Sequence, residues 1–190
     1  MTAYTWIHPK LQVKSTSRHG LGIFAKGSLR RGTILFVMGG HIIDTREEIR
    51  LGRLATDYGM DISEDFAFVP RTRSDLRRMP QLLVNHSCAP NAGFHGSQFI
   101  VSIRSIPAGE EVCYDYAFVM WRSWRSKRHF RLRCACGAPS CRSVITEDDW
   151  RRPEIQRRYS DYFQPFLQEK IGRINKRRRT IRQSARRSEA

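Results

Sequence analysis

Short apolar runs separated by turn residues fill the first two thirds of the chain and predict a fold built mainly from short strands. The runs are rich in Val, Ile, Phe and Tyr, which favour extended backbone, and glycines or prolines stand between them. The four clearest predicted strands are Thr33–Val37, Phe66–Val69, Gln98–Ile106 and Glu111–Tyr116. With 190 residues, 40% of them hydrophobic, the chain can bury a core, so we expect one domain with appendages.

Helical patterns are found in three places. Thr45-x-x-Glu48 fits a capping box and predicts one helix from Thr45, with an apolar side made by Ile49, Leu51 and Leu54. Thr146-x-x-Asp149 resembles a second helix start. Pro165 opens a third helix, in which apolar residues recur at i, i+4 and i+7 (Leu167, Ile171 and Ile174). The last fifteen residues lack a core-forming pattern, so we expect a frayed basic tail there.

Charge narrows the classes of partner. The chain has 34 Lys and Arg against 18 Asp and Glu, which gives a formal charge of +16 and a pI of about 10.5. A protein with this positive charge attracts negatively charged partners, such as nucleic acid, an anionic membrane surface or an acidic protein. The longest uncharged apolar stretch, residues 32–43, is far shorter than the roughly 20 residues that cross a bilayer, and the first 25 residues do not resemble a secretory signal. We therefore expect an intracellular protein with no membrane-spanning segment.

Composition divides the chain into five regions. The expected order is an N-terminal lead-in (1–9), a strand-rich domain (10–118), a basic aromatic linker (119–133), a cysteine motif (134–143), and a helical extension with a basic tail (144–190). The linker is set apart because it carries six Lys and Arg and no acid, with two Trp residues interleaved.

Three cysteines lie close together in Cys134-Ala-Cys136-Gly-Ala-Pro-Ser-Cys141. The chain has five cysteines, and an odd number without a secretory signal argues against a disulfide scaffold. Three thiols within eight turn-rich residues favour a metal such as Zn²⁺, which takes four ligands in a tetrahedron. The motif is one ligand short, and spacing alone leaves Cys88, Cys113 and His129 as candidates. A site closed by four protein ligands is structural rather than catalytic.

Polar residues follow the apolar segment Leu82-Leu83-Val84 in the run Asn85-His86-Ser87-Cys88-Ala89-Pro90-Asn91. Such a loop at the end of a core segment is a usual place for a functional site, but an Asn/Pro turn that caps its own backbone is an equally good interpretation. Tyr114 and Tyr116 share one face of the predicted strand 111–116 because side chains alternate. By themselves, two strand tyrosines indicate packing.

Together these residues resemble the SET-domain protein lysine methyltransferases. The resemblance rests on four motifs in the family's order: Gly20-Leu21-Gly22-Ile23-Phe24, Asn85–Asn91, Gly109–Tyr116, and the post-SET cysteines. It covers residues 10–143, and the compact chain is similar to the small bacterial members. The resemblance implies a mainly β (α+β) fold: a β-clip of short strands with a pseudoknot-like active site, a zinc-bound post-SET segment and C-terminal helices.

The resemblance also implies roles for individual residues. Gly20, Leu21, Gly22, Asn85 and His86 would bind S-adenosylmethionine, and Cys88 would be the fourth ligand of a structural Zn²⁺ with Cys134, Cys136 and Cys141. Tyr116 would be the catalytic tyrosine at the end of a channel for a lysine of a protein substrate. Tyr114 stands where the family sets the number of methyl groups, and a tyrosine there favours mono- or dimethylation.

Two positions depart from the family pattern. Val37-Met38-Gly39 stands where many members have Tyr-x-Gly, so one wall of the lysine channel is less polar or another residue such as Tyr58 replaces that tyrosine. Leu82-Leu83 stands where an Arg-Phe pair often precedes the Asn-His motif. Both changes bear on substrate and product specificity.

The charge of +16 fits poorly with a lysine on a basic tail, because like charges repel. One solution is non-specific binding of nucleic acid by residues 122–133 and the tail, since residues 171–190 hold eight Lys and Arg and one acid. Another is a substrate that is acidic around its target lysine. The alternative function is a catalytically inactive, zinc-stapled basic module that binds nucleic acid or protein.

Overall fold

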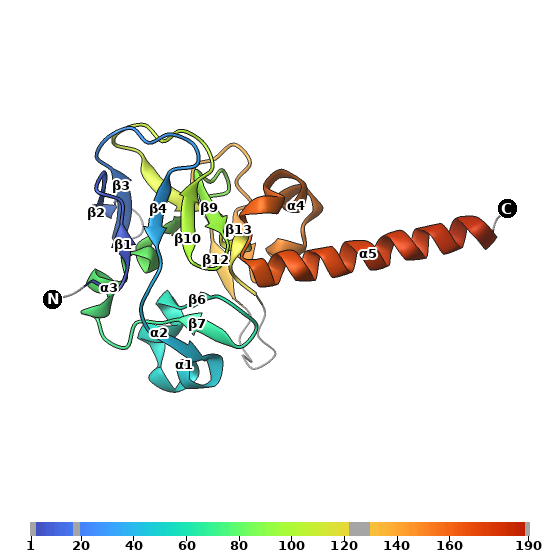
Figure 1. The fold of residues 1–190 in the computed structure, drawn as a ribbon, viewed down its shortest axis with the longest axis horizontal. Helices are drawn as coiled ribbons and strands as arrows, with labels where there is room; N and C mark the ends of the chain where they lie inside the picture. The colour runs from blue at the N-terminus through green and yellow to red at the C-terminus, as the bar shows by residue number, and fades with distance from the viewer. Residues whose placement is uncertain (1–2, 17–19, 122–129, 189–190) are drawn as a thin grey trace.

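The computed structural model describes residues 3–16, 20–121 and 130–188, and four small sheets make up most of the domain (Figure 1). The first sheet is antiparallel, in the order β1-β4-β10-β9. Its strands are β1 (Trp6–Ile7), β4 (Ile34–Val37), β10 (Phe99–Ser102) and β9 (Ala92–His95). The third sheet, β5-β7-β6, consists of β5 (Ile42–Asp44), β7 (Phe66–Phe68) and β6 (Met60–Asp61).

The second sheet carries the motifs of the resemblance. Its order is β2-β3-β11-β8, with strands β2 (Leu11–Thr16), β3 (Gly20–Ala25), β11 (Glu111–Tyr114) and β8 (Asn85–His86). Strand β8 runs parallel to β11, whereas β2, β3 and β11 pair in antiparallel fashion. The predicted mainly β fold of short strands is therefore confirmed.

The predicted helix does begin at Thr45, but it is not a single helix and its cap is another residue. There are two short helices, α1 (Thr45–Leu51) and α2 (Arg53–Tyr58), because Gly52 adopts a φ of 81°, which interrupts the helical backbone. The cap is Asp44 rather than Thr45, since the Asp44 carboxylate accepts a hydrogen bond from the Arg46 N–H at 2.7 Å. Leu51 is 39% exposed, so the apolar side expected there is incomplete.

One large core joins the sheets to the C-terminal segments. The C-terminal segments include the 3₁₀ turn η3 (Asp149–Arg151) and helices α4 (Pro153–Tyr159) and α5 (Pro165–Ser188). Residues 149–167 contribute buried apolar side chains to the same core as the strands: Trp150, Ile155, Phe163 and Leu167. Thr146-x-x-Asp149 thus precedes a 3₁₀ turn, and the longer helix α4 begins only at Pro153. The helix expected from Pro165 is confirmed, with Ile171 and Ile174 packed against the core.

The expectation of a frayed tail is wrong as far as the structure describes the chain, because α5 continues to Ser188 and extends away from the domain (Figure 1). Lys and Arg are good helix formers, and packing of the first three turns removes the cost of nucleating the helix. The remaining turns carry charge rather than core contacts. Ile181, for example, is 57% exposed.

The expected linker 119–133 contains a strand at its end. Residues 131–133 form β12 (Arg131–Arg133), which pairs with β13 (Val144–Thr146) to enclose the cysteine motif between them. Residues 122–129, with Trp124 and His129, lie outside the described residues. Within the described ranges, no helix is both long and apolar enough for a bilayer span.

Candidate active site and cysteine cluster

The parallel pairing of β8 with β11 brings the two polar motifs together. Asn85 lies beside Cys113 and His86 beside Tyr114. The Asn91 side chain closes the loop onto β11: its Nδ2 donates to the Glu111 carbonyl at 2.7 Å, and its Oδ1 accepts from the Cys113 N–H at 2.9 Å. Asn91 therefore bonds to a neighbouring strand and not to its own turn, which favours a built site over a self-capping turn.

Asn85 connects β8 to the glycine strand. Its Nδ2 donates to the Leu21 carbonyl at 3.1 Å and to Glu111 Oε1 at 2.7 Å. A Cβ on Gly22 would lie 2.4 Å from Glu111 Oε1 and 2.9 Å from Asn85 Nδ2, so only glycine leaves room for this bond. Gly20 differs from Gly22, because no atom within 4 Å opposes a Cβ there and its φ of 76° is what favours glycine.

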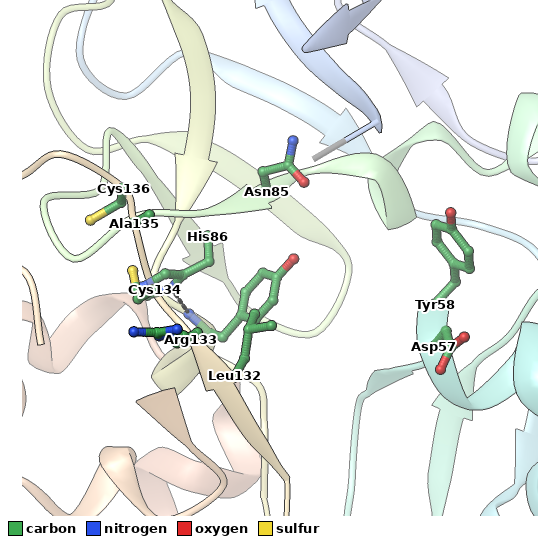
Figure 2. Close-up of a pocket in the computed structure, with 10 residues that line it drawn as sticks. Asp57, Tyr58, Asn85, His86, Leu132, Arg133, Cys134, Ala135 and Cys136 are labelled. Carbon is green, nitrogen blue, oxygen red and sulfur yellow. Dashed lines mark hydrogen bonds between the residues drawn. The ribbon is translucent and has the colours of Figure 1, made fainter. Parts of the chain in front are cut away.

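Two clefts meet at these residues. The first, here called the tyrosine cleft, has a volume of about 320 Å³ and is lined by Asp57, Tyr58, Asn85, His86, Tyr116 and residues 132–136 (Figure 2). The second, the glycine-strand cleft, has a volume of about 430 Å³ and is lined by Ser15, Thr16, Phe24, residues 85–87, Glu110, Glu111, Cys113 and Cys136. Asn85, His86 and Cys136 line both clefts, so a ligand in one lies next to a ligand in the other.

Tyr116 is not in the strand. β11 ends at Tyr114, and Tyr116 begins the 3₁₀ turn η2 (Tyr116–Phe118), which Asp115 caps by accepting from the Ala117 N–H at 3.0 Å. The two tyrosine rings nevertheless lie together, with their centroids 5.5 Å apart. The strand expected over 111–116 is therefore too long by two residues, yet the shared location of the rings is as expected.

Burial controls the chemistry of the Tyr116 hydroxyl. Desolvation, followed by the charges of Cys113 and Glu111, raises the pKa of the Tyr116 phenol well above its usual value. The hydroxyl stays protonated at neutral pH, so it can donate a hydrogen bond but cannot act as a general base. It lies 3.5 Å from the Val84 carbonyl.

Tyr58 lines the tyrosine cleft together with Tyr116, and Figure 2 shows Tyr58 on a different segment from Asn85 and His86. It comes from the end of α2 and is 37% exposed. Val37, at the position where many family members have a tyrosine, lies in the middle of the first sheet between β1 and β10, and does not line either cleft. The placement of Tyr58 fits the alternative in which it replaces that tyrosine.

Four cysteines form a cluster between the loop after β8 and the segment after β12. The sulfurs of Cys88, Cys134, Cys136 and Cys141 all lie within 4.8 Å of one another, and Cys88 Sγ is 3.9 Å from Cys134 Sγ. Sulfurs around a tetrahedral Zn²⁺ with bonds of about 2.3 Å are about 3.8 Å apart. The donor set therefore fits zinc. Cys113 is absent from the cluster, because it faces the glycine-strand cleft.

Backbone N–H groups support thiolate charge at this cluster. The Arg142 N–H lies 3.4 Å from Cys88 Sγ, and the Ser143 N–H lies 3.4 Å from Cys141 Sγ. Burial alone would raise the pKa of the Cys136 thiol, but hydrogen bonds from the N–H groups of Cys88 and Ala138, followed by those from the neighbouring cysteine thiols, lower it to about 6. A thiolate is the form that binds a metal, so the protein prepares at least this ligand for an ion.

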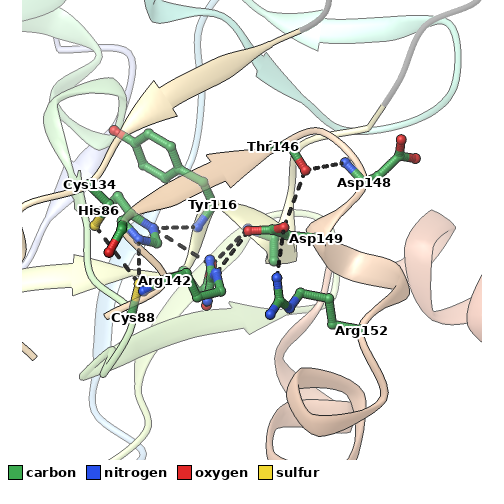
Figure 3. Close-up of polar contacts among 12 residues, drawn as sticks. His86, Cys88, Tyr116, Cys134, Arg142, Thr146, Asp148, Asp149 and Arg152 are labelled. Carbon is green, nitrogen blue, oxygen red and sulfur yellow. Dashed lines mark hydrogen bonds and ion pairs between the residues drawn. The ribbon is translucent and has the colours of Figure 1, made fainter. Parts of the chain in front are cut away.

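Sequence reasoning missed a buried ion network beside the cluster. Arg142 forms ion pairs with Asp115 and Asp149 inside the molecule (Figure 3). An arginine after the last cysteine and an aspartate between two tyrosines were visible in the sequence. Their pairing across 27 residues was not, since the chain offers many other charged partners.

Comparison with known proteins identifies the family. A SET-domain family model matches residues 20–117, more than half of the chain. The chain is 32% identical over 145 residues to the Arabidopsis thaliana protein named histone H3-lysine(4) N-trimethyltransferase ATX1, covering 69% of this chain and 13% of that protein. A Schizosaccharomyces pombe protein named H3 lysine-4 specific histone-lysine N-methyltransferase is 31% identical over 141 residues, which cover 67% of this chain and 14% of that protein.

A solved structure shares the fold. The crystal structure of KRYPTONITE in complex with mCHG DNA and SAH aligns with a TM-score of 0.54 at 19% sequence identity, over 70% of this chain and 28% of that one. The chain belongs to the SET-domain family, as its four motifs indicated. It spans about one seventh or less of the length of the curated relatives named above.

Proposed function

We propose that this chain is an S-adenosylmethionine-dependent protein-lysine N-methyltransferase. The observation that carries the proposal is the meeting of the two clefts at Asn85 and His86, with Tyr116 on one side and the glycine strand on the other. Methyl transfer needs a donor and an acceptor in adjoining sites. The relatives' names as histone-lysine methyltransferases support the same reaction.

The glycine-strand cleft fits S-adenosylmethionine. Its volume of about 430 Å³ lies within the range of about 300–1,000 Å³ of small-molecule sites. Gly20, Leu21 and Gly22 do not line it themselves, but the first two pair with Thr16 and Ser15, which do. Asn85 and His86 supply polar side chains to its wall. The KRYPTONITE complex contains SAH, a related compound, which supports the same kind of ligand here. When bound, S-adenosylmethionine supplies a methyl group on a positively charged sulfur.

The tyrosine cleft prepares the acceptor lysine. A lysine amine attacks only when neutral, and its usual pKa is near 10.4. Aromatic walls formed by Tyr58 and Tyr116 remove water from the ammonium and lower this pKa. Tyr116 orients the amine, and alignment of this kind contributes about 7–11 kcal/mol to bringing two reactants together.

Tyr114 sets the number of methyl groups in this proposal. It is 5% exposed, and its ring packs against Tyr116 and against Phe94. A hydroxyl at this depth occupies space and can hold a water molecule where a larger methylated amine would need room. Mono- or dimethylation is therefore the expected outcome.

The cysteine cluster holds a structural Zn²⁺ in this proposal. All four ligands, Cys88, Cys134, Cys136 and Cys141, come from the protein, so no position is open for substrate. The thiols must stay reduced to bind the ion, which fits an intracellular setting.

The substrate is a protein with an accessible lysine, and the local charge at the cleft accommodates a basic segment. Residues 44–65, which supply α1, α2 and β6, hold seven acids and three bases in a chain whose total charge is +16. Burial favours the protonated forms of Glu48 and Asp61, which leaves five carboxylates to carry negative charge. Asp57 from this segment lines the tyrosine cleft. The repulsion expected from the total charge is thus relieved on this side of the site, and an acidic substrate is not required.

The second candidate function is non-specific nucleic-acid binding by α5. Lys176, Arg177, Arg178 and Arg179 are consecutive and exposed on a helix that extends from the domain (Figure 1). Consecutive residues point about 100° apart, so this part of α5 offers positive charge on all sides without a base-reading face. Deleting residues 175–190 should lower affinity for duplex DNA and reduce its salt dependence. Unchanged affinity would exclude this role.

The reaction is tested by transfer of a labelled methyl group from S-adenosylmethionine into proteins of a cell lysate. Wild type should label at least one band that Tyr116→Phe does not. Tyr162→Phe is the matched control, because its hydroxyl bonds to Arg31 far from the clefts, and it should label as wild type does. Absence of both labelling and S-adenosylmethionine binding would leave the inactive basic module as the better interpretation.

A further inference from the structure

The side chain of Arg142 lies inside the molecule between the cysteine cluster and the turn that carries Tyr116. Its exposure is 9%, that of Asp115 is 0% and that of Asp149 is 6%. Arg142 directly follows Cys141, and Asp115 directly precedes Tyr116. The Arg142 guanidinium therefore connects the end of the cysteine cluster to the turn that places Tyr116 in the tyrosine cleft (Figure 3).

The contacts leave little freedom for any of the three groups. Arg142 Nη1 and Nη2 donate to the two oxygens of Asp115, each at 2.7 Å, and Nε donates to Asp149 Oδ2 at 2.8 Å. Paired bonds of this kind fix the plane of the guanidinium and the carboxylate together. Asp115 Oδ1 also accepts from the Ala117 N–H, so the same carboxylate shapes the turn that begins at Tyr116.

Arg142 touches the cysteine cluster through its backbone. Its N–H points at Cys88 Sγ at 3.4 Å, while the side chain reaches Asp115. If the segment 134–142 separated, Asp115 would be a buried carboxylate without its cation, which is strongly unfavourable.

We propose that Arg142 is a positioning residue that makes the placement of Tyr116 depend on an assembled cysteine cluster. This role rests on the proposed function only in its expected effect on kcat, because the placement of Tyr116 can be measured without turnover. Arg142 does not line either cleft, so it acts through Asp115 and the η2 turn and not by contact with substrate or S-adenosylmethionine.

Arg142→Lys is the primary test, because a lysine keeps the charge but cannot make the paired bonds to Asp115 and the third bond to Asp149 together. Arg152→Lys is the matched control: Arg152 also approaches Asp149, at 3.8 Å, but is 45% exposed and far less constrained. We expect kcat of Arg142→Lys to fall about tenfold to a hundredfold, the loss expected for a misplacement of about 1 Å. Affinity for S-adenosylmethionine and zinc content should stay near wild type, and Arg152→Lys should match wild type throughout.

A second readout does not depend on turnover. The Tyr116 N–H donates to His86 Nδ1 at 3.1 Å, so the Tyr116 amide resonance in ¹⁵N-tyrosine-labelled protein reports where Tyr116 lies. Arg142→Lys should shift this resonance, chelation of the metal from wild type should shift it as well, and Arg152→Lys should not. If wild type transfers no methyl group but these shifts are seen, the proposed function fails and the positioning role stands.

The double variant Arg142→Gln with Asp115→Asn covers the case in which Arg142→Lys does not fold. Two neutral amides at 142 and 115 can hydrogen-bond to each other without a buried charge. Asp149 keeps Arg152 at 3.8 Å and the bond from the Thr146 hydroxyl at 3.2 Å. It should fold, and should show a reduced kcat and a shifted Tyr116 resonance. Wild-type kcat together with an unshifted resonance, in either variant, overturns the inference.

Discussion

Tyr116 and His86 are joined by a bond from the backbone of one to the ring of the other. The Tyr116 N–H donates to His86 Nδ1 at 3.1 Å, and the two rings meet edge to face with centroids 5.2 Å apart. Because Nδ1 accepts, the ring proton of this tautomer sits on Nε2, which lies 3.3 Å from Cys88 Sγ. His86 thus connects the turn of Tyr116 to a proposed metal ligand.

His86→Ala should therefore weaken metal binding as well as catalysis. Groups that hydrogen-bond to metal ligands commonly contribute tenfold to a hundredfold in affinity, and we expect a loss of about that size for Zn²⁺. Competition with a chromophoric chelator measures it. His95→Ala is the control, since His95 is exposed on β9 away from the cluster. Equal zinc affinity in both variants would contradict a link between His86 and the cluster.

Gly22→Ala should weaken S-adenosylmethionine binding while the fold is kept. The new Cβ would displace Glu111 or Asn85, whose bond at 2.7 Å holds the glycine-strand cleft. We expect the dissociation constant, measured by calorimetry, to rise at least about tenfold, equivalent to about 1.4 kcal/mol. Gly27→Ala meets only the flexible Lys10 side chain, at 3.4 Å, and should bind normally. Normal binding by Gly22→Ala would argue against this cleft as the cofactor site.

Cys136→Ser and Cys113→Ser should separate the two kinds of cysteine. Purified wild type should contain one zinc per chain by elemental analysis. Cys136→Ser should lose it, because Cys136 is one of the four clustered sulfurs. Cys113→Ser should keep it, since Cys113 lies outside the cluster and burial raises the pKa of its thiol far above neutrality. Loss of zinc from both variants to the same extent would reject the proposed ligand set.

Tyr114→Phe should increase the number of methyl groups added. Removing the buried hydroxyl leaves room for a methylated amine at the end of the channel, while the ring still packs on Phe94. Mass spectrometry of the modified lysine should show a shift toward trimethylation with overall activity retained. Tyr4→Phe, whose ring stacks on Arg78 and His41 outside both clefts, should give the wild-type product pattern. An unchanged pattern in Tyr114→Phe would place the control of product elsewhere.

Glu48 and Asp61 should make the domain less stable as the pH rises. Burial raises the pKa of Glu48 to about 7, and burial together with the Glu48 charge raises that of Asp61 to about 8. Both groups bind protons in the folded state at a pH where the unfolded chain has lost them, so their contribution to stability is fully present below about pH 4 and is lost by about pH 8.

Asn and Gln at these positions should remove that dependence. Since one pKa unit corresponds to about 1.4 kcal/mol, Glu48→Gln with Asp61→Asn should stabilise the domain by at least about 1 kcal/mol at pH 8.5. Thermal unfolding at pH 5 and pH 8.5 measures the difference. Glu154→Gln is the control, because Glu154 is exposed and bonds to Arg152. A double variant with the same pH dependence as wild type would refute the assignment.

Local sequence predicted the strands well where β-branched and aromatic residues cluster, as in β4 and β7. The local sequence did not predict where an element ends when a single backbone angle or capping residue sets that end. Gly52, with φ at 81°, splits the helix expected from Thr45, and Asp115 turns the chain before Tyr116 can continue β11. Neither effect changes hydrophobic periodicity, so no pattern of apolar residues reports it.

The residues of the candidate site were predicted mainly from the resemblance to the SET-domain family. Spacing alone predicted a metal for Cys134, Cys136 and Cys141 and left three candidates for the fourth ligand; the resemblance named Cys88, which the structure places beside them. Arg142 gave no such signal, because its partners are distant in sequence and common in type. Physical reasoning from one sequence finds local chemistry, whereas long-range pairing depends on the whole fold.

The distance in sequence between the parts of the site also determines when it can form. Strand β8 can pair only after β11 has been synthesised, and Cys88 meets Cys134, which follows 46 residues later in the chain. Closing such long loops is slow, because their entropy cost precedes the contacts that stabilise them. A chain emerging from the ribosome thus has Asn85 and Tyr116 well before Cys141 and Arg142. Activity should begin only after the last of these is synthesised and a metal ion has been captured.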